Sequence, residues 1–156
     1  ARGTFNAHPY VMGGMNAFLR RLQTPEIQAL YEGQDARWDA RAQRFNDVMA
    51  RHGFPVRAAH LQSIWTLTYT EPGRYHWMFQ YYLRWHGLAL SWVGTGRLIF
   101  GLHLSDDDFE EVLRRFVAAA QDMQTQGWWW RAPGLTRKAI RRQVLREMLA
   151  GMGFML

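Results

Sequence analysis

Few side chains in this sequence are able to do nucleophilic or metal chemistry. Its 156 residues contain no cysteine, which excludes a thiolate metal site, a cysteine nucleophile and a disulfide. Among the six histidines, His60, His76 and His86 lack the spacing to carboxylates that a metal site requires. His103 precedes a predicted helix start, where a histidine more often belongs to the cap region than acts as a base. We therefore predict no metal centre and assign no catalytic histidine.

Two cationic side chains could serve a small anionic substrate or amine chemistry. Arg97 lies in a predicted short strand, and a guanidinium binds a carboxylate through two parallel hydrogen bonds. It is a candidate substrate-binding residue, although a surface salt bridge is the more frequent role of such an arginine. Lys138, the only lysine, lies among three arginines on the charged face of a predicted helix, where solvation is the usual role.

A possible phosphate-binding loop opens the sequence, with the residues Gly3-Thr4-Phe5-Asn6-Ala7-His8-Pro9. It places a hydroxyl and several backbone amides just before a helix that proline can start. Unpaired amides at a helix N-terminus and the helix dipole favour an anion such as phosphate. A threonine at this place is also a frequent turn residue, so both roles stay open for Thr4 on this ground alone.

Apolar residues at helical spacing predict two helices in the first third of the chain. The first starts at Pro9 and stops before Pro25. The second runs from Glu26 to about His52 and ends at Gly53. A long, partly exposed helix of this kind often links two lobes.

The middle of the chain carries strand signals around one aromatic helix. Alternation and β-forming residues predict a strand over residues 56–70. A helix is predicted from Tyr75 to His86, closed by Gly87. Two short strands, Leu88–Val93 and Arg97–Leu102, are then predicted to form a hairpin.

The last third is predicted to be helical. Ser105 and the three aspartates after it form a helix start, because a hydroxyl and carboxylates satisfy the unpaired amides and the helix dipole. This helix should run to about Gln126. After the break at Trp128–Trp130, apolar residues from Ile140 to Met152 predict an amphipathic basic helix. The resulting fold class is α+β, a small mainly antiparallel sheet with helices packed on it and an appended basic C-terminal helix.

Several motifs, taken in order, resemble those of one enzyme family. Residues 3–15, with Gly-Thr-Phe, Pro9 and a small-residue helix, are similar to the stretch that class III aminotransferases carry after their catalytic lysine. Residues 22–31 resemble the segment that leads into the family's inter-domain helix, and residues 62–65 resemble one of its strands. Residues 98–108 resemble the ending of glutamate-1-semialdehyde aminomutases, where a strand leads into an acidic helix start. The chain thus resembles the C-terminal part of a fold-type-I aminotransferase over roughly residues 2–126.

The resemblance implies the C-terminal lobe of an enzyme that uses pyridoxal 5′-phosphate (PLP) in a homodimer and acts on a small amino or carbonyl substrate. Thr4 would contact the cofactor phosphate of the neighbouring subunit, with the amide of Gly3 or Phe5 as possible help. PLP chemistry requires a Schiff-base lysine. Lys138 stands in the wrong chain order for that role, so we expect the lysine on an upstream PLP-domain segment and an inactive fragment. The family pattern has other residues at the positions of His8, Trp65 and Gly101. The substrate, and the choice between a transaminase and an aminomutase, therefore stay open.

The resemblance also implies an organisation in four segments. They are the end of the PLP-binding domain (1–25), an inter-domain helix (26–53), a small C-terminal α+β domain (54–127) and a Trp-rich basic tail (128–156).

The net charge of +6 belongs mainly to the tail. Residues 1–126 carry 13 Arg against 12 Asp and Glu, whereas residues 127–156 carry five Arg and one Lys against one Glu. The nearly equal numbers of positive and negative charges in residues 1–126 argue against general nucleic-acid binding.

The tryptophans and the basic helix of the tail could dock on an anionic membrane or cover an apolar patch of the upstream part, and we favour the second. A stand-alone interaction module that uses this helix for a membrane or protein partner is the alternative function, and nucleic-acid binding through the helix is another. The sequence shows no membrane span and no signal peptide, so a cytoplasmic protein is expected.

Overall fold

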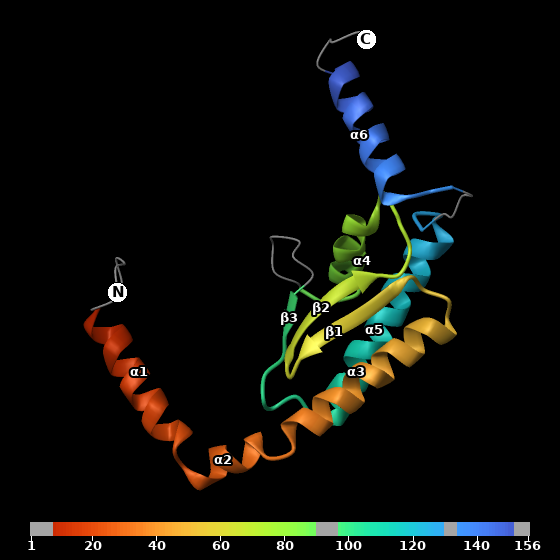
Figure 1. Cartoon of the computed structure of the whole chain (residues 1–156). Helices are drawn as coiled ribbons and strands as arrows, with labels where there is room; N and C mark the ends of the chain where they lie inside the picture. Colours follow the sequence, from red (N-terminus) through yellow and green to blue (C-terminus); the bar gives the residue numbers. More distant parts are fainter. Residues whose placement is uncertain (1–7, 90–96, 130–133, 152–156) are drawn as a thin grey trace. The chain divides into compact units, whose positions relative to one another are not determined.

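The computed structural model describes residues 8–89, 97–129 and 134–151. The chain divides into two compact units, Ala1–Arg37 and Trp38–Leu156. Figure 1 labels the α-helices and strands. The elements in chain order are α1 (Pro9–Leu22), α2 (Pro25–Tyr31), α3 (Gln34–Arg51), β1 (Val56–Leu61), β2 (Ile64–Tyr69), the 3₁₀ turn η1 (His76–Met78), α4 (Phe79–Trp85), β3 (Arg97–Ile99), α5 (Asp106–Thr125) and α6 (Arg137–Gly151).

The first unit contains α1 and α2. The predicted helix that starts at Pro9 is confirmed, and Pro9 occupies the first turn, where its fixed φ suits the helix and its missing N–H is not needed. Pro25 in turn starts α2. No side chain of α1 is buried, and its large apolar residues, such as Tyr10 and Phe18, are exposed.

The single long helix predicted from Glu26 to His52 is wrong, because Glu32 and Gly33 separate α2 from α3. Gly33 has a φ of +68°, in the left-handed region that glycine enters without steric cost. Gly53, with a φ of +69°, closes α3 in the predicted place. The residues between these glycines supply much of the core, so α3 is an integral part of the second unit from Trp38 onward.

The sheet has three antiparallel strands in the order β1-β2-β3. The single strand predicted over residues 56–70 is therefore wrong, since the chain reverses at Gln62 and Ser63 between β1 and β2. Leu61 and Ile64 form the last pair of the hairpin, and Gln62 takes a φ of +50°. No glycine or proline marks this turn, so the alternating pattern runs through it without interruption.

The two short strands predicted after α4 are only partly observed. β3 covers Arg97–Ile99 and pairs with β2. The next three residues were predicted to continue the strand, but they are not in a strand. Phe100 instead leaves the sheet after its amide donates to the carbonyl of Ser63 at 3.0 Å. Leu88 and Ala89 are not in a strand. Residues 90–96, on which the predicted hairpin depends, lie outside the described residues.

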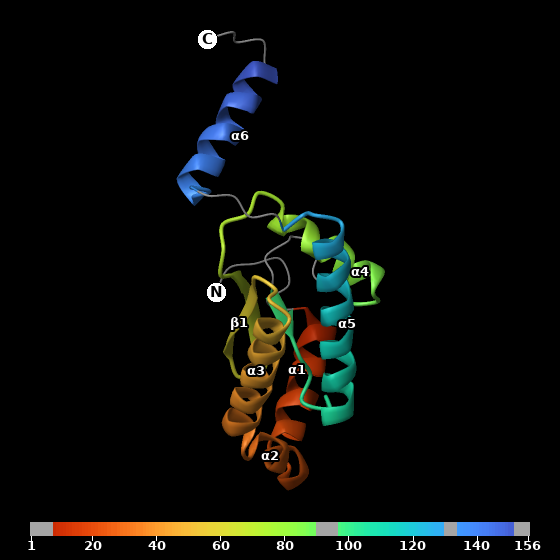
Figure 2. The ribbon, with the colours of Figure 1, turned by 90° about the vertical axis from the view of Figure 1, so that its right-hand side faces the viewer.

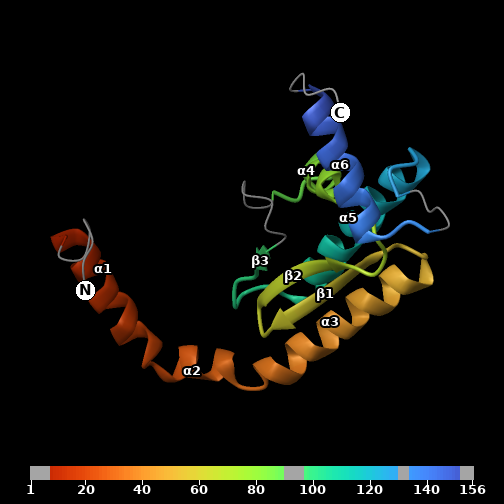
Figure 3. The ribbon, with the colours of Figure 1, turned by 45° about the horizontal axis from the view of Figure 1, so that its top comes forward.

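The helices α3 and α5 pack on one face of the sheet, and α4 packs against α5. Figure 2 shows α3 and α5 side by side, and Figure 3 shows β1 and β2 with α3 beside them and α5 behind them. Trp65 of β2 is 1% exposed and lies at the centre of the core. Its ring contacts those of Trp38, Phe45, Phe100 and Phe109 at centroid distances of 5.2–6.1 Å. The predicted α+β class is confirmed.

Two of the three consecutive tryptophans complete this core. Trp129 contacts Phe54 and Phe79 with ring centroids 6.2 and 5.1 Å apart, and Trp128 contacts Tyr75 at 5.1 Å. Trp128 and Trp129 therefore pack at least partly on their own unit, and the covering of an upstream part of the protein stays a prediction. Trp130 lies outside the described residues.

Candidate functional site

The predicted phosphate-binding residues Gly3, Thr4 and Phe5 lie outside the described residues. The structure does describe the helix that follows them, with α1 starting at Pro9 and His8 at its N-cap. The amide of Met12 donates to the carbonyl of His8 at 3.0 Å. The role of Thr4 stays a prediction.

The face of the sheet that turns away from the helices is open. It carries every second residue of each strand, because side chains alternate across a strand. We call this surface the open sheet face; its members are Arg57, Ala59, Leu61, Ile64, Thr66, Thr68, Arg97 and Ile99.

Arg97, the predicted substrate-binding residue, lies on the open sheet face and pairs in register with Thr66 of the central strand. Arg57 of β1 pairs in the same way with Thr68. Two exposed guanidinium groups therefore flank two threonine hydroxyls, and among the described residues neither guanidinium is engaged by a carboxylate. Both guanidinium groups are donors suited to a carboxylate or phosphate, whereas the hydroxyl of Thr68 already donates to the carbonyl of Arg57 at 3.1 Å.

An apolar corner adjoins these polar groups. Leu61, Ile64 and Ile99 face one another across the three strands in direct register. Leu61 and Ile99 are each 75% exposed. The open sheet face thus combines a cationic part with an apolar part, as a surface that binds a small acid or packs against further protein would.

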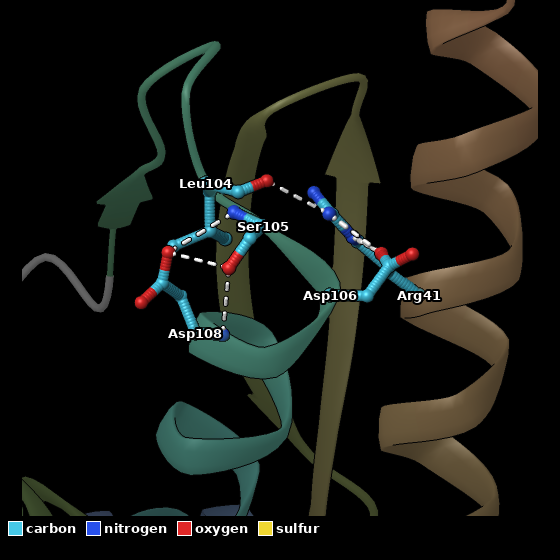
Figure 4. A network of polar contacts seen from close by, with 5 residues as sticks. All are labelled: Arg41, Leu104, Ser105, Asp106 and Asp108. Atoms are coloured by element: carbon cyan, nitrogen blue, oxygen red, sulfur yellow. Dashed lines mark hydrogen bonds and ion pairs between the residues drawn. The ribbon is translucent and has the colours of Figure 1, made fainter.

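A polar network fixes the segment that leads from β3 into α5 (Figure 4). The guanidinium of Arg41 is buried, and its Nη2 donates to the carbonyl of Leu104 at 2.9 Å and to Asp106 Oδ1 at 2.8 Å. The same guanidinium lies over the ring of Trp38, 4.7 Å from the centroid, and over that of Phe109 at 5.6 Å. Arg41 thereby ties α3 to the start of α5.

The predicted helix start at Ser105 is confirmed as a capping box. The amide of Asp108 donates to Ser105 Oγ at 3.0 Å, and the amide of Ser105 donates to Asp108 Oδ2 at 3.1 Å. These hydrogen bonds from Ser105 hold the pKa of the Asp108 carboxyl below its usual value. The end of β3, and with it Arg97, is therefore anchored to a fixed helix terminus.

The histidines make local contacts. His60 Nε2 lies 3.4 Å from Asp39 Oδ1, and His86 Nε2 lies 2.7 Å from Asp122 Oδ2. His76 stacks on Tyr69 with centroids 3.9 Å apart, and burial lowers the pKa of its imidazole. The residues that the structure describes contain no group of three His, Asp or Glu side chains placed to hold a metal ion.

His103 and Lys138 are both exposed. His103 lies in the turn before α5, where Ser105 supplies the cap. Lys138 lies in the first turn of α6, and among the described residues no carboxylate pairs with it. None of the helices in the described part of the chain is long and apolar enough to cross a membrane.

The sequence alone did not identify Arg41 as a buried residue that holds α3 to the start of α5. Arg41 lies three residues after Trp38 and one before Ala42, within the apolar stripe of α3. An arginine on an apolar stripe with an acidic helix start further along the chain is the signal that could have indicated it.

Comparison with known proteins supports the fold. No protein-family model and no curated protein matches the sequence. Among solved structures, the chain is similar to an omega-transaminase from Sphaerobacter thermophilus, with a TM-score of 0.63 and 17% sequence identity. The similarity covers 80% of this chain and 30% of the omega-transaminase chain. The chain therefore has the fold of the C-terminal lobe of a transaminase, and it spans less than a third of that protein's length.

Proposed function

We propose that this chain is the C-terminal lobe of a PLP-dependent aminotransferase or aminomutase, nearest in its motifs to glutamate-1-semialdehyde aminomutases. The observation that carries the proposal is the likeness to a transaminase over 80% of the chain. The order of the family-like motifs agrees with it. When bound, PLP would accept the amino group of one substrate and pass it to a carbonyl carbon of another substrate or of the same one.

The described residues form no PLP site on their own, so no chemical step is assigned to them. The sequence has one lysine, Lys138, and it is exposed on α6 beside Arg137 and Arg141. We infer that the lysine of the complete enzyme belongs to a segment outside this sequence. The chain alone should then show no aminotransferase activity with any amine donor.

Thr4 is proposed to hold the phosphate of PLP bound by the neighbouring subunit of a homodimer. A hydrogen bond to a charged group contributes about 1.5–3 kcal/mol, which corresponds to about a 10–100-fold change in affinity. We expect Thr4→Val to raise the PLP dissociation constant of the complete dimer by that factor. The matched control is Thr125→Val, at the exposed end of α5. Equal PLP affinity in Thr4→Val and wild type would refute the role.

Arg97 is proposed to bind the carboxylate of the substrate. Arg97→Gln should raise KM for a donor that carries a carboxylate about 10–100-fold while kcat changes little, because a charge-assisted pair is lost from substrate binding. The matched control is Arg57→Gln, on the same open sheet face at the far strand. If both variants raise KM equally, the general positive charge of the open sheet face binds the substrate, and not an ion pair with Arg97. The assignment of Arg97 then fails.

A second candidate function rests on α6. None of its 15 residues is buried, and an ion pair joins its Glu147 to Arg74. The alternative is an interaction module that uses this cationic helix. A truncation that removes residues from Thr136 onward tests it, since Trp128 and Trp129 stay in the core. Loss of binding to anionic vesicles or to an acidic protein with unchanged unfolding would favour the module, and destabilisation would favour packing of α6 within the protein.

A further inference from the structure

A pocket of about 360 Å³ lies between α4 and α5, apart from the open sheet face. Its volume falls in the range of about 300–1,000 Å³ that is typical of small-molecule sites. We call it the α4–α5 pocket; it is lined by Met78, Tyr81, Tyr82, Trp85, Asp122 and Gln126.

The walls of the pocket are aromatic and accessible. Tyr81 is 54% exposed and Trp85 is 84% exposed, although aromatic rings of this size are usually buried. An aromatic ring carries a partial negative charge on its face. Three rings from one helix, together with the thioether of Met78, therefore offer apolar contact and attraction for a cation.

One carboxylate lies beside these rings. Asp122 is the single ionisable acid of the lining, and its Oδ2 accepts a hydrogen bond from His86 Nε2 at 2.7 Å. Its side chain remains 48% exposed. The contact with His86 fixes the orientation of the carboxylate and leaves its other oxygen available to a ligand.

The opposite side of the pocket is also held in place. The hydroxyl of Tyr82 donates to Gln126 Oε1 at 2.5 Å, which links α4 to the end of α5. The pocket lining contains no cationic side chain. Arg115, about two turns before Asp122 on α5, donates to Glu111 and to the carbonyl of Gly87. Its charge is therefore engaged by these groups.

We propose that the α4–α5 pocket binds an organic cation, an alkylammonium group such as a quaternary ammonium. Aromatic faces and one carboxylate both favour positive charge, and methyl groups on the nitrogen match the apolar walls. An anion would be repelled by the Asp122 carboxylate, because the lining has no cationic side chain, and a neutral apolar ligand would desolvate the exposed part of that carboxylate. This site is independent of the proposed PLP function, so either can fail without the other.

The test is a titration of the full chain with choline and with its neutral isostere 3,3-dimethylbutan-1-ol, at pH 8. Ring currents of the pocket aromatics should shift the choline methyl protons in NMR spectra. We expect saturable choline binding at millimolar concentration. The isostere should bind at least tenfold more weakly. Equal binding of the two ligands, or no saturable shift, would overturn the proposal.

Two variants locate the site. Asp122→Asn keeps a group that can pair with His86 and should weaken choline binding about tenfold, and Trp85→Leu, at an exposed position, should weaken it about two- to fivefold. The matched control is Asp107→Asn, an exposed aspartate in the first turn of α5, which should bind choline like the wild type. Wild-type affinity in Asp122→Asn, with unchanged circular dichroism, would contradict the site.

The cation could be free or could belong to a protein side chain. A peptide that contains trimethyllysine distinguishes the sources, because its backbone would add contacts outside the pocket. Binding at least tenfold tighter than choline assigns the pocket to a modified peptide, and equal affinity assigns it to a free cation. Both results support the cation site, whereas a peptide shift that survives in both variants would place the binding elsewhere.

Discussion

Replacing Arg41 with methionine tests how the start of α5 is held. The buried guanidinium donates to the carbonyl of Leu104 at 2.9 Å and to Asp106, and it lies over two aromatic rings. Methionine keeps an apolar side chain of similar length in the stripe of α3. The substitution therefore removes the charge and the hydrogen bonds with little change in packing volume.

The expected cost follows from the contacts. A carbonyl left without its donor costs about 1–3 kcal/mol, and each cation–π contact is worth about 0.5–1 kcal/mol. The ion pair with Asp106 adds at most about 1 kcal/mol, because the side chain of Asp106 is 87% exposed. We expect Arg41→Met to lower the free energy of unfolding by about 2–6 kcal/mol in total.

Urea unfolding followed by circular dichroism measures this change. With a urea m-value of about 2 kcal/mol/M, the midpoint should fall by about 1–3 M. The matched control is Asp106→Asn, which removes the exposed partner and should cost about 1 kcal/mol, including the lost charge at the helix N-terminus. If the two variants are equally unstable, the ion pair and not the buried guanidinium anchors α5, and the reasoning is refuted.

Three further predictions concern the core, the sheet edge and pH. Trp65→Ala should cost about 3–5 kcal/mol in urea unfolding, against less than about 1 kcal/mol for the half-exposed Trp77→Ala; similar losses would contradict the position of Trp65 in the core. Asn46→Ala should cost about 1–3 kcal/mol, because the Asn46 amide makes hydrogen bonds of 2.8 and 3.1 Å with the outer edge of β1; a neutral result would show that water replaces them. Burial lowers the pKa of His76 below its value of about 6.5 in the unfolded chain, so its contribution to stability is present above pH 6.5 and decreases as the pH falls toward the folded pKa. Urea unfolding at pH 7.5 and 5.5 should show a smaller decrease in His76→Gln than in the wild type or in His103→Gln, and an equal decrease in all three would contradict this origin.

Residue-type signals predicted several helix ends, although they missed the break at Gly33 and the start of α4 at Phe79. Proline at Pro9, the hydroxyl of Ser105 and the glycines at Gly53 and Gly87 mark ends that depend on local chemistry, and the structure has them there. The turn at Gln62 was missed because a glutamine at positive φ has no signal of its own. The hairpin is held by pairing across β1 and β2 and by burial of Trp65, which are tertiary effects.

The candidate site was predictable only in part. Arg97 was identified by residue type, but its neighbours on the open sheet face depend on strand register, which a missed turn had hidden. The packing of Trp128 and Trp129 was also not predictable from local sequence. Trp128 contacts Tyr75 and Trp129 contacts Phe79, so each contact joins segments about 50 residues apart. The α4–α5 pocket likewise needs two helices brought together by the fold.

The central claim is that this chain is one lobe of a PLP enzyme. The most direct measurement is the intact mass of the protein from its natural source after borohydride reduction, which makes a bound pyridoxal group permanent on its lysine. If this chain is one lobe of a PLP enzyme, the natural protein is heavier than 18.3 kDa and carries a pyridoxyl group on a lysine outside this sequence. A natural chain of 18.3 kDa without that group would contradict it.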